Sequence, residues 1–179
     1  MQYRRSKDGG ATYFFTVVTH NRSKFLCNEE NVELLRSIMR TVMVRHPFVI
    51  DAMIVMPDHL HTIWTLPEGD NDFPMRWNLI KREFSRRCDS KYKRHPSESR
   101  VSKGEQTIWQ RRYWEHLIRD DDDFIHHVEY IHYNPVKHGY VTKPGEWRYS
   151  SFHRYVNQGV YASDWGNSDM VFDESVGNE

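Results

Sequence analysis

Two histidines separated by one residue are the first feature of this sequence that could support chemistry. His59 and His61 lie in the stretch MPDHLHTIW (residues 56–64), which follows the apolar run FVIDAMIV. Side chains alternate across a strand, so both imidazoles would point to one face while Leu60 points to the other. Two adjacent imidazoles can chelate one metal ion. They could equally be ordinary strand histidines, with Asp58 either making a turn or accepting a hydrogen bond that fixes an imidazole tautomer.

A second group of polar side chains lies on a predicted helix at residues 120–139, DDDDFIHHVEYIHYNPVKHG. Tyr130 and Asn134 are one turn apart and therefore share a face of the helix, which His126 extends. A neighbouring apolar stripe would dock this helix on a sheet; its residues are Phe124, Val128 and Ile131. Acids in the first turn suit the positive end of the helix dipole. Because Pro135 disfavours a helical conformation for the residue before it, we expect the helix to end near Asn134.

The remaining elements alternate between strands and helices. We predict strands at residues 11–20, 48–58, 59–69 and 107–118, helices at 28–46 and 72–91, and an irregular basic loop at 91–106. Pro57 and Asp58 would join the second and third strands as a hairpin. This order predicts an α+β, ferredoxin-like (RRM-like) antiparallel sheet, with helices on one face and an additional C-terminal helix.

The composition suits a soluble globular protein: 38% of the 179 residues are hydrophobic and 28% are charged. The sequence has no apolar run of about 18 residues and no secretory signal pattern, so we expect a cytoplasmic protein without a membrane partner. Cys27 and Cys88 form no C-x-x-C pair, which removes zinc ribbons and redox motifs from consideration.

Charge is unevenly distributed along the chain. Residues 161–179 carry five acids and no Lys or Arg, which leaves residues 1–160 with 25 basic and 20 acidic residues. We predict one domain at 1–160 and an acidic C-terminal tail at 161–179. The mildly basic body permits a polyanionic partner.

Taken together, the motifs resemble those of a known family. HLH at 59–61, followed by YIHYNPVKHGYV at 130–141, looks like the pattern of the single-tyrosine HUH transposases, where U is a bulky hydrophobic residue. Longer stretches, including WQRRYWEHLIRDDDDFIHHVEYIHYNPVKHG and WRYSSFHRYV, are similar to the REP-associated tyrosine transposases of bacteria. The resemblance covers roughly residues 3–165 and implies the same ferredoxin-like fold.

The resemblance also implies a reaction. His59 and His61 would be metal ligands, and Tyr130 on the C-terminal helix would be the nucleophile. Asn134 matches the position of a third ligand, where many family members have glutamine. The implied enzyme is an endonuclease and transesterase that uses Mg²⁺ or Mn²⁺ and cleaves and rejoins single-stranded DNA at REP-type hairpins through a 5′-phosphotyrosine.

Other residues would support this site or the DNA. Asp58, His126 and His127 would orient the ligands rather than bind the metal. Lys and Arg attract phosphates without sequence preference, and aromatic rings stack on unpaired bases. The candidate DNA contacts are Arg4, Arg5, Lys7, Arg22, Lys24, Arg111, Arg112 and Trp114, with Trp109 and Tyr113 as further stacking candidates.

Two other functions remain open from the residues alone. A non-catalytic, RRM-like module could bind single-stranded nucleic acid without metal. A metal-dependent oxygenase or hydrolase built on the H-x-H motif is disfavoured, because no acid follows His61 until Glu68 and the predicted elements are not all β. For the transposase we expect a nucleoid-associated monomer, with a homodimer as the alternative.

Overall fold

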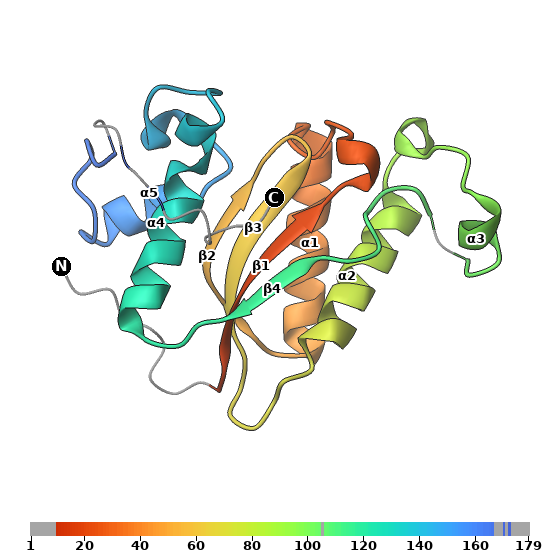
Figure 1. Cartoon of the computed structure of the whole chain (residues 1–179), viewed down its shortest axis with the longest axis horizontal. Coiled ribbons are helices and arrows are strands. Elements are labelled where there is room, and N and C mark those ends of the chain that lie inside the picture. Colours follow the sequence, from red (N-terminus) through yellow and green to blue (C-terminus); the bar gives the residue numbers. More distant parts are fainter. Residues whose placement is uncertain (1–9, 105, 167–169, 171, 173–179) are drawn as a thin grey trace.

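A four-stranded antiparallel sheet separates two layers of helices (Figure 1). The computed structural model describes residues 10–104, 106–166, 170 and 172. The strands are β1 (Thr12–Val18), β2 (Val49–Val55), β3 (His59–Thr65) and β4 (Trp114–Leu117), arranged in the order β2-β3-β1-β4. This order is that of the ferredoxin-like fold, so the predicted fold class is confirmed.

One face of the sheet packs against α1 (Glu29–Arg45) and α2 (Phe73–Arg87). The strands send alternate residues to this side, and Leu60 and Trp64 of β3 are fully buried there. The indole of Trp64 stacks on that of Trp77 from α2, with ring centroids 4.2 Å apart. Burial of large apolar side chains on this side supplies much of the hydrophobic stabilisation of the fold.

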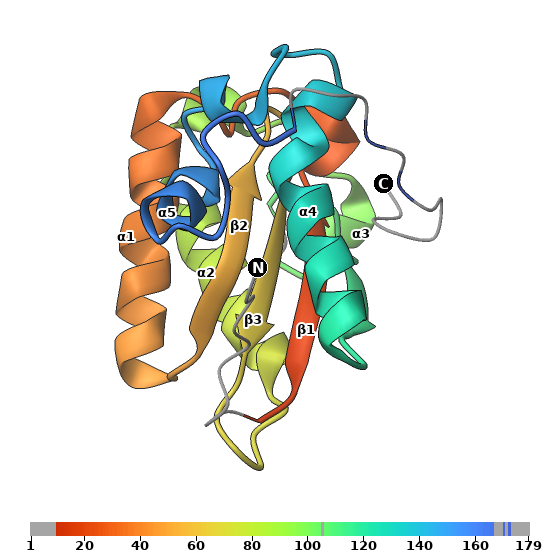
Figure 2. The same ribbon diagram turned by 90° about the vertical axis from the view of Figure 1, so that its left-hand side faces the viewer.

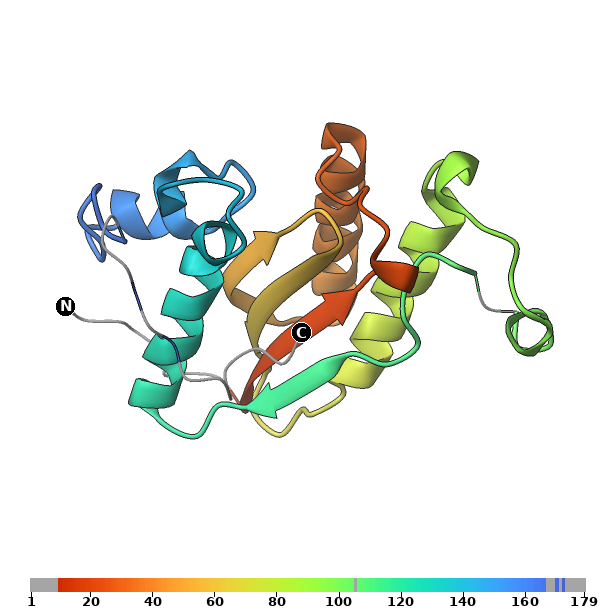
Figure 3. The ribbon, with the colours of Figure 1, turned by 45° about the horizontal axis from the view of Figure 1, so that its top comes forward.

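The opposite face is covered by α4 (Asp121–Lys137) and α5 (Phe152–Asn157), as the two rotated views show (Figures 2 and 3). The apolar stripe predicted for α4 is confirmed: Phe124, Val128 and Ile131 are buried against the sheet. Phe14 and Ile63 supply the strand side of this second core. The sheet face opposite α1 and α2 is therefore also buried, and it forms a second hydrophobic core.

Helix α4 ends three residues beyond its predicted end. Asp120 caps its first turn by accepting a hydrogen bond from the backbone N–H of Asp123, at 2.8 Å. The helix then continues through Pro135 to Lys137, so the expectation of an end near Asn134 is wrong. A proline this close to a C-terminus removes one hydrogen bond of the last turns, and the packing of the buried face outweighs that loss.

Two further boundaries differ from the prediction. The strand expected at 107–118 forms only at Trp114–Leu117, because the preceding residues leave the sheet edge after an isolated bridge between Thr19 and Trp109. The segment expected to be an irregular loop contains a 3-10 turn, η2 (Ser90–Tyr92), and a short helix, α3 (Glu98–Val101). Two more 3-10 turns are η1 (His20–Arg22) and η3 (Pro144–Glu146).

The chain beyond α5 folds back on α4. Both ring nitrogens of His132 are hydrogen-bonded: Nε2 lies 2.7 Å from Ser151 Oγ, and Nδ1 lies 3.0 Å from the Tyr161 hydroxyl. Complete burial lowers the pKa of His132 to about 3, so this imidazole is neutral near pH 7. Trp165 stacks on Tyr161, with centroids 4.3 Å apart. The first residues of the predicted acidic tail thus pack on the domain, and most of the rest lies outside the described residues.

In the part of the chain that the structure describes, no helix is both long and apolar enough to cross a lipid bilayer.

The docking of α4 can be tested by replacing Ile131, which is fully buried on its sheet-facing side. Ile131→Ala should lower the free energy of unfolding by about 2 to 5 kcal/mol, because it leaves a cavity in a packed core. Urea denaturation measures this change. His126→Ala, an exposed position on the same helix, is the matched control and should shift the value by less than about 0.5 kcal/mol. Equal effects of the two substitutions would contradict the packing described here.

Candidate active site

The histidine pair lies at the start of strand β3 and faces helix α4. His59 and His61 are 1% and 0% exposed, and Leu60 between them is buried on the α1 side, so the predicted division between faces is confirmed. The two rings lie with centroids 4.8 Å apart and planes inclined by 73°. Steeply inclined imidazoles can direct one nitrogen each toward a common point, which is the arrangement that a shared cation requires.

The His59 ring is held by Asp58. Asp58 Oδ1 lies 2.7 Å from His59 Nδ1, and its Oδ2 accepts a hydrogen bond from Arg22 Nη1 at 3.3 Å. Burial raises the pKa of Asp58, but hydrogen bonds from His59 and Arg22 more than offset this and lower it. An ionised Asp58 accepts the proton of Nδ1, which leaves the lone pair on Nε2. Nε2 of His59 is buried and has no hydrogen-bond partner among the described residues.

The position of Asp58 depends on the segment that follows β1. The backbone carbonyl of Asp58 accepts hydrogen bonds from both the N–H and the hydroxyl of Thr19, at 2.8 and 2.9 Å. The carbonyl of Pro57 accepts from the N–H groups of Phe25 and Leu26, each at 2.9 Å. Hydrogen bonds from the segment after β1 therefore hold the hairpin turn between β2 and β3, and with it the carboxylate of Asp58.

The His61 ring is held across the sheet. Thr16 is its partner in the antiparallel register of β1 and β3, and Thr16 Oγ1 lies 2.9 Å from His61 Nδ1. The other ring nitrogen, Nε2, lies 3.3 Å from the side-chain amide nitrogen of Asn134 on α4. Turning that amide by 180° would bring its oxygen to the same place, and the two orientations are not distinguished by shape.

Tyr130 lies beside the pair. Its ring meets His61 edge-on, with centroids 5.3 Å apart, and it is 1% exposed. Phe172 packs edge-on against it at 5.7 Å. The phenol oxygen accepts a hydrogen bond from Lys137 Nζ at 3.0 Å. The structure thus brings together His59, His61, Tyr130 and Asn134, which the sequence places in two separate motifs.

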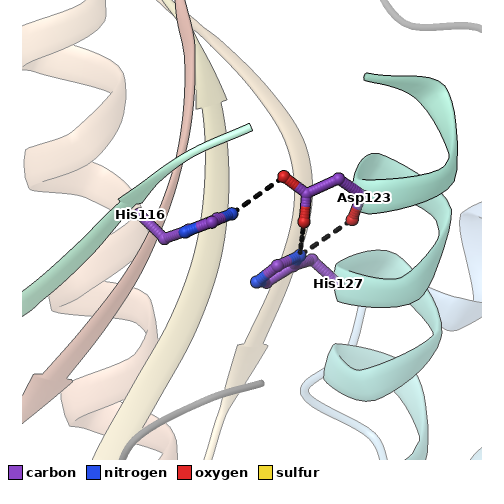
Figure 4. A group of neighbouring side chains, drawn as sticks. All are labelled: His116, Asp123 and His127. Atoms are coloured by element: carbon purple, nitrogen blue, oxygen red, sulfur yellow. Dashed lines mark hydrogen bonds and ion pairs between the residues drawn. The ribbon is translucent and has the colours of Figure 1, made fainter. Parts of the chain in front are cut away.

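A second histidine cluster lies between β4 and the start of α4 (Figure 4). Asp123 Oδ2 lies 2.8 Å from His116 Nε2, and Asp123 Oδ1 lies 3.1 Å from His127 Nδ1. Burial raises the pKa of Asp123, but hydrogen bonds from the Arg119 backbone and His116, with the charge of His127, lower it to about 2. Of the described residues, these three form a group of metal-type ligands, with ligand atoms within 4.8 Å of one another.

The ring geometry distinguishes this cluster from the first pair. His116 and His127 are stacked, with planes only 16° apart and centroids separated by 4.7 Å. A cation bound by an imidazole lies near the ring plane, so one ion could not lie in both planes unless a ring turned. The cluster is better described as two imidazoles oriented by one carboxylate.

His127 also contacts Phe14, which in turn contacts His61, with centroid distances of 4.7 and 5.5 Å. His126, in contrast, is exposed.

A groove of about 420 Å³ lies at β1, β4 and the segments beside them. Thr16, which supports His61, forms part of its wall. The other lining residues are Val18, Arg22, Gln110, Arg112, Tyr113 and Trp114. Four of the residues predicted to contact DNA therefore line one groove: Arg22, Arg112, Tyr113 and Trp114.

The other predicted contacts lie elsewhere. Arg111 donates hydrogen bonds to Ser99 in the α3 segment, and Lys24 lies over the ring of Tyr140, 5.8 Å from its centroid. Trp109 is 4% exposed and packs against Phe84 in the α2 layer, so it cannot stack on a base. Arg4, Arg5 and Lys7 fall outside the described residues.

Sequence reasoning missed Thr16 and Lys137. Nothing local marks Thr16, because its role follows from the register of β1 with β3, between residues 45 positions apart. For Lys137 a signal existed: it lies seven residues after Tyr130, which places both on one side of a helix if the helix continues. The expected helix end at Asn134 concealed this relation.

Comparison with known proteins agrees with the geometry. Residues 9–134 match the family model described as "Transposase IS200 like". The chain is 43% identical to the REP-associated tyrosine transposase of Escherichia coli (strain K12) over 176 residues, which is 98% of this chain and 96% of that protein. It also matches a solved structure described as a REP-associated tyrosine transposase bound to a REP hairpin. That match has a TM-score of 0.76 and 42% identity, covering 100% of this chain and 98% of the other.

The chain therefore belongs to the IS200-like transposase family, and within it to the REP-associated tyrosine transposases. The resemblance stated from the motifs is confirmed.

The hydrogen bonds of Asp123 make acid stability a test of the second cluster. The carboxyl pKa is lowered from 3.8 to about 2, so its contribution is complete above pH 3.8 and is lost as pH falls through 2. A shift of this size corresponds to about 2 kcal/mol. Asp123→Asn should lose that much unfolding free energy at pH 7, and the gap to the wild type should narrow between pH 5 and pH 2. Asp122→Asn, at the exposed neighbouring position, is the control. A gap independent of pH would show that the charge of Asp123 contributes nothing.

Proposed function

We propose that this transposase cleaves and rejoins single-stranded DNA at REP-type hairpins through a covalent 5′-phosphotyrosine on Tyr130. One observation carries the proposal: the ring of Tyr130 lies against His61, and His59 beside it has a buried Nε2 without a hydrogen-bond partner among the described residues. The hairpin in the structure of the 42% identical relative supports the choice of substrate.

The residues of the pair fit a divalent cation. Nδ1 of each imidazole is occupied, by Asp58 and by Thr16, so both Nε2 atoms can serve as ligands, and Asn134 can add an amide oxygen. This mixed N/O donor set suits Mg²⁺ or Mn²⁺, of which Mn²⁺ tolerates imidazole better. When bound, such an ion would polarise the scissile phosphate and neutralise charge on its oxygens.

The chain's own residues supply the nucleophile and its orientation. The Tyr130 oxygen attacks phosphorus, an O–P bond to tyrosine forms, and the bond from phosphorus to the 3′ oxygen breaks. The phenol loses its proton to solvent and the leaving oxygen gains one, which gives a 3′-OH. In the reverse direction a 3′-OH displaces the tyrosine, so strands are rejoined without ATP. Asp58, Thr16 and Phe14 hold the imidazoles and the phenol in place during both steps.

The groove beside β1 and β4 is the path that we propose for the single strand. Arg22 and Arg112 would contact phosphates, and Trp114 and Tyr113 would stack on bases. Because Thr16 belongs both to this groove and to the support of His61, a strand in the groove runs next to the histidine pair.

The nucleophile is tested by incubating the protein with a single-stranded REP hairpin that carries flanking sequence, in Mn²⁺ or Mg²⁺. A protein–DNA adduct that survives denaturation should form with the wild type and be absent with Tyr130→Phe, because phenylalanine has no oxygen to attack phosphorus. Tyr133→Phe is the matched control: it is buried on the same helix and should retain the adduct. EDTA and His59→Ala should each abolish adduct formation.

A retained adduct in Tyr130→Phe would assign the nucleophile elsewhere. Metal-independent hairpin binding without any adduct in the wild type would instead favour a non-catalytic, RRM-like binding module.

The groove is tested through the salt dependence of binding. Arg112→Ala should weaken hairpin binding and reduce the slope of log Kd against log salt concentration by about one, as expected for one lost phosphate contact. Fluorescence anisotropy with a labelled hairpin at several salt concentrations measures both. Arg40→Ala, an exposed arginine of α1 on the other side of the sheet, should leave the slope unchanged. If both variants have the wild-type slope, the strand does not occupy this groove.

A further inference from the structure

We propose that Lys137 is a catalytic residue, whose ammonium group stabilises negative charge on the phenol oxygen of Tyr130 both when that oxygen attacks and when it leaves. The inference rests on the function proposed above for Tyr130. Its basis is a direct contact: Lys137 Nζ donates a hydrogen bond to the phenol oxygen at 3.0 Å and lies 4.6 Å from the centre of the same ring.

The contact follows from the unbroken course of α4. Seven residues separate Tyr130 from Lys137, which is close to two helical turns and returns the side chain to the same side of the helix. The helix continues through Pro135 and ends at Lys137. A lysine in a last turn is common, because a cation there interacts favourably with the helix dipole. That general role requires no contact with a particular side chain, whereas here the ammonium reaches the reacting oxygen.

The surroundings make such a charge effective. Tyr130 is 1% exposed and is packed between Phe14 and Phe172, so little water solvates the oxygen. A free tyrosine has a pKa near 10 and is a poor nucleophile at neutral pH. A positively charged donor in a poorly hydrated place stabilises a phenolate more strongly than water does.

The ammonium remains protonated throughout the proposed step. During cleavage the phenol proton passes to water, the O–P bond to tyrosine forms, and the hydrogen bond from Lys137 shortens as charge develops on the oxygen. During rejoining the O–P bond breaks, the phenolate leaves against the same ammonium, and it then takes a proton from water. Lys137 neither gains nor loses a proton, so any cation able to reach the oxygen should substitute in part.

The test compares adduct formation and rejoining in Lys137→Met, Lys137→Arg and the wild type, with a REP hairpin and Mn²⁺. Lys137→Met keeps the length of the side chain and removes the charge; it should slow both directions by about tenfold to a hundredfold, the range expected for a lost charge-assisted hydrogen bond. Lys137→Arg should recover part of the rate. Lys103→Met, which removes an exposed lysine from the segment after α3, is the control and should react at the wild-type rate.

Hairpin affinity separates this role from simple phosphate binding. If Lys137 acts on the phenol oxygen, Lys137→Met binds the hairpin with the wild-type Kd and salt slope, and only the rates fall. A weaker Kd with a slope reduced by about one, and an unchanged rate at saturating DNA, would make Lys137 a phosphate contact and overturn the inference. A wild-type rate in Lys137→Met would also overturn it while the function of Tyr130 stands. Absence of any adduct in the wild type would overturn both.

Discussion

A neutral imidazole has one N–H and one lone pair, and a hydrogen-bond partner that accepts from one nitrogen places the lone pair on the other. This site depends on that constraint twice. His59 meets it through Asp58, and His61 meets it through Thr16. Neither support is local in origin. Asp58 is fixed by the segment after β1, and Thr16 faces His61 only because β1 and β3 pair in one register. A slip by one residue would turn Thr16 to the other face and leave His61 without its partner.

Helix α4 carries the other half of the chemistry at regular intervals along one element. Asp123 and His127 lie at its start, Tyr130 in its middle, and Asn134 and Lys137 near its end. Polar groups are costly to bury, and the helix remains docked because apolar residues between them pack on the sheet. The same docking that stabilises the fold therefore sets where the phenol, the amide and the ammonium stand relative to the imidazoles.

The two layers of helices have different roles, one in packing and the other in positioning the site. The α1 and α2 layer is built around stacked aromatic side chains such as Trp64 and Trp77, and no described residue of the histidine site comes from it. The histidine pair, the tyrosine and the second cluster around Asp123 lie instead between the sheet and α4. The groove lined by Arg112 and Trp114 lies at β4, the short edge strand that precedes α4.

Local pattern was enough to predict the order of the strands and the long helices and the faces of their side chains, but not all of their boundaries or the short helix α3. Alternation in β3 placed His59 and His61 together, and the spacing in α4 predicted both its buried stripe and the common face of Tyr130 and Asn134. The local pattern could not predict the register of the paired strands or the rotation of α4 about its axis, because both depend on contacts between residues far apart in the chain. The strand register selected Thr16. The rotation of α4 buried His127 and exposed His126, and tertiary packing carried the helix past Pro135 and so brought Lys137 to the phenol.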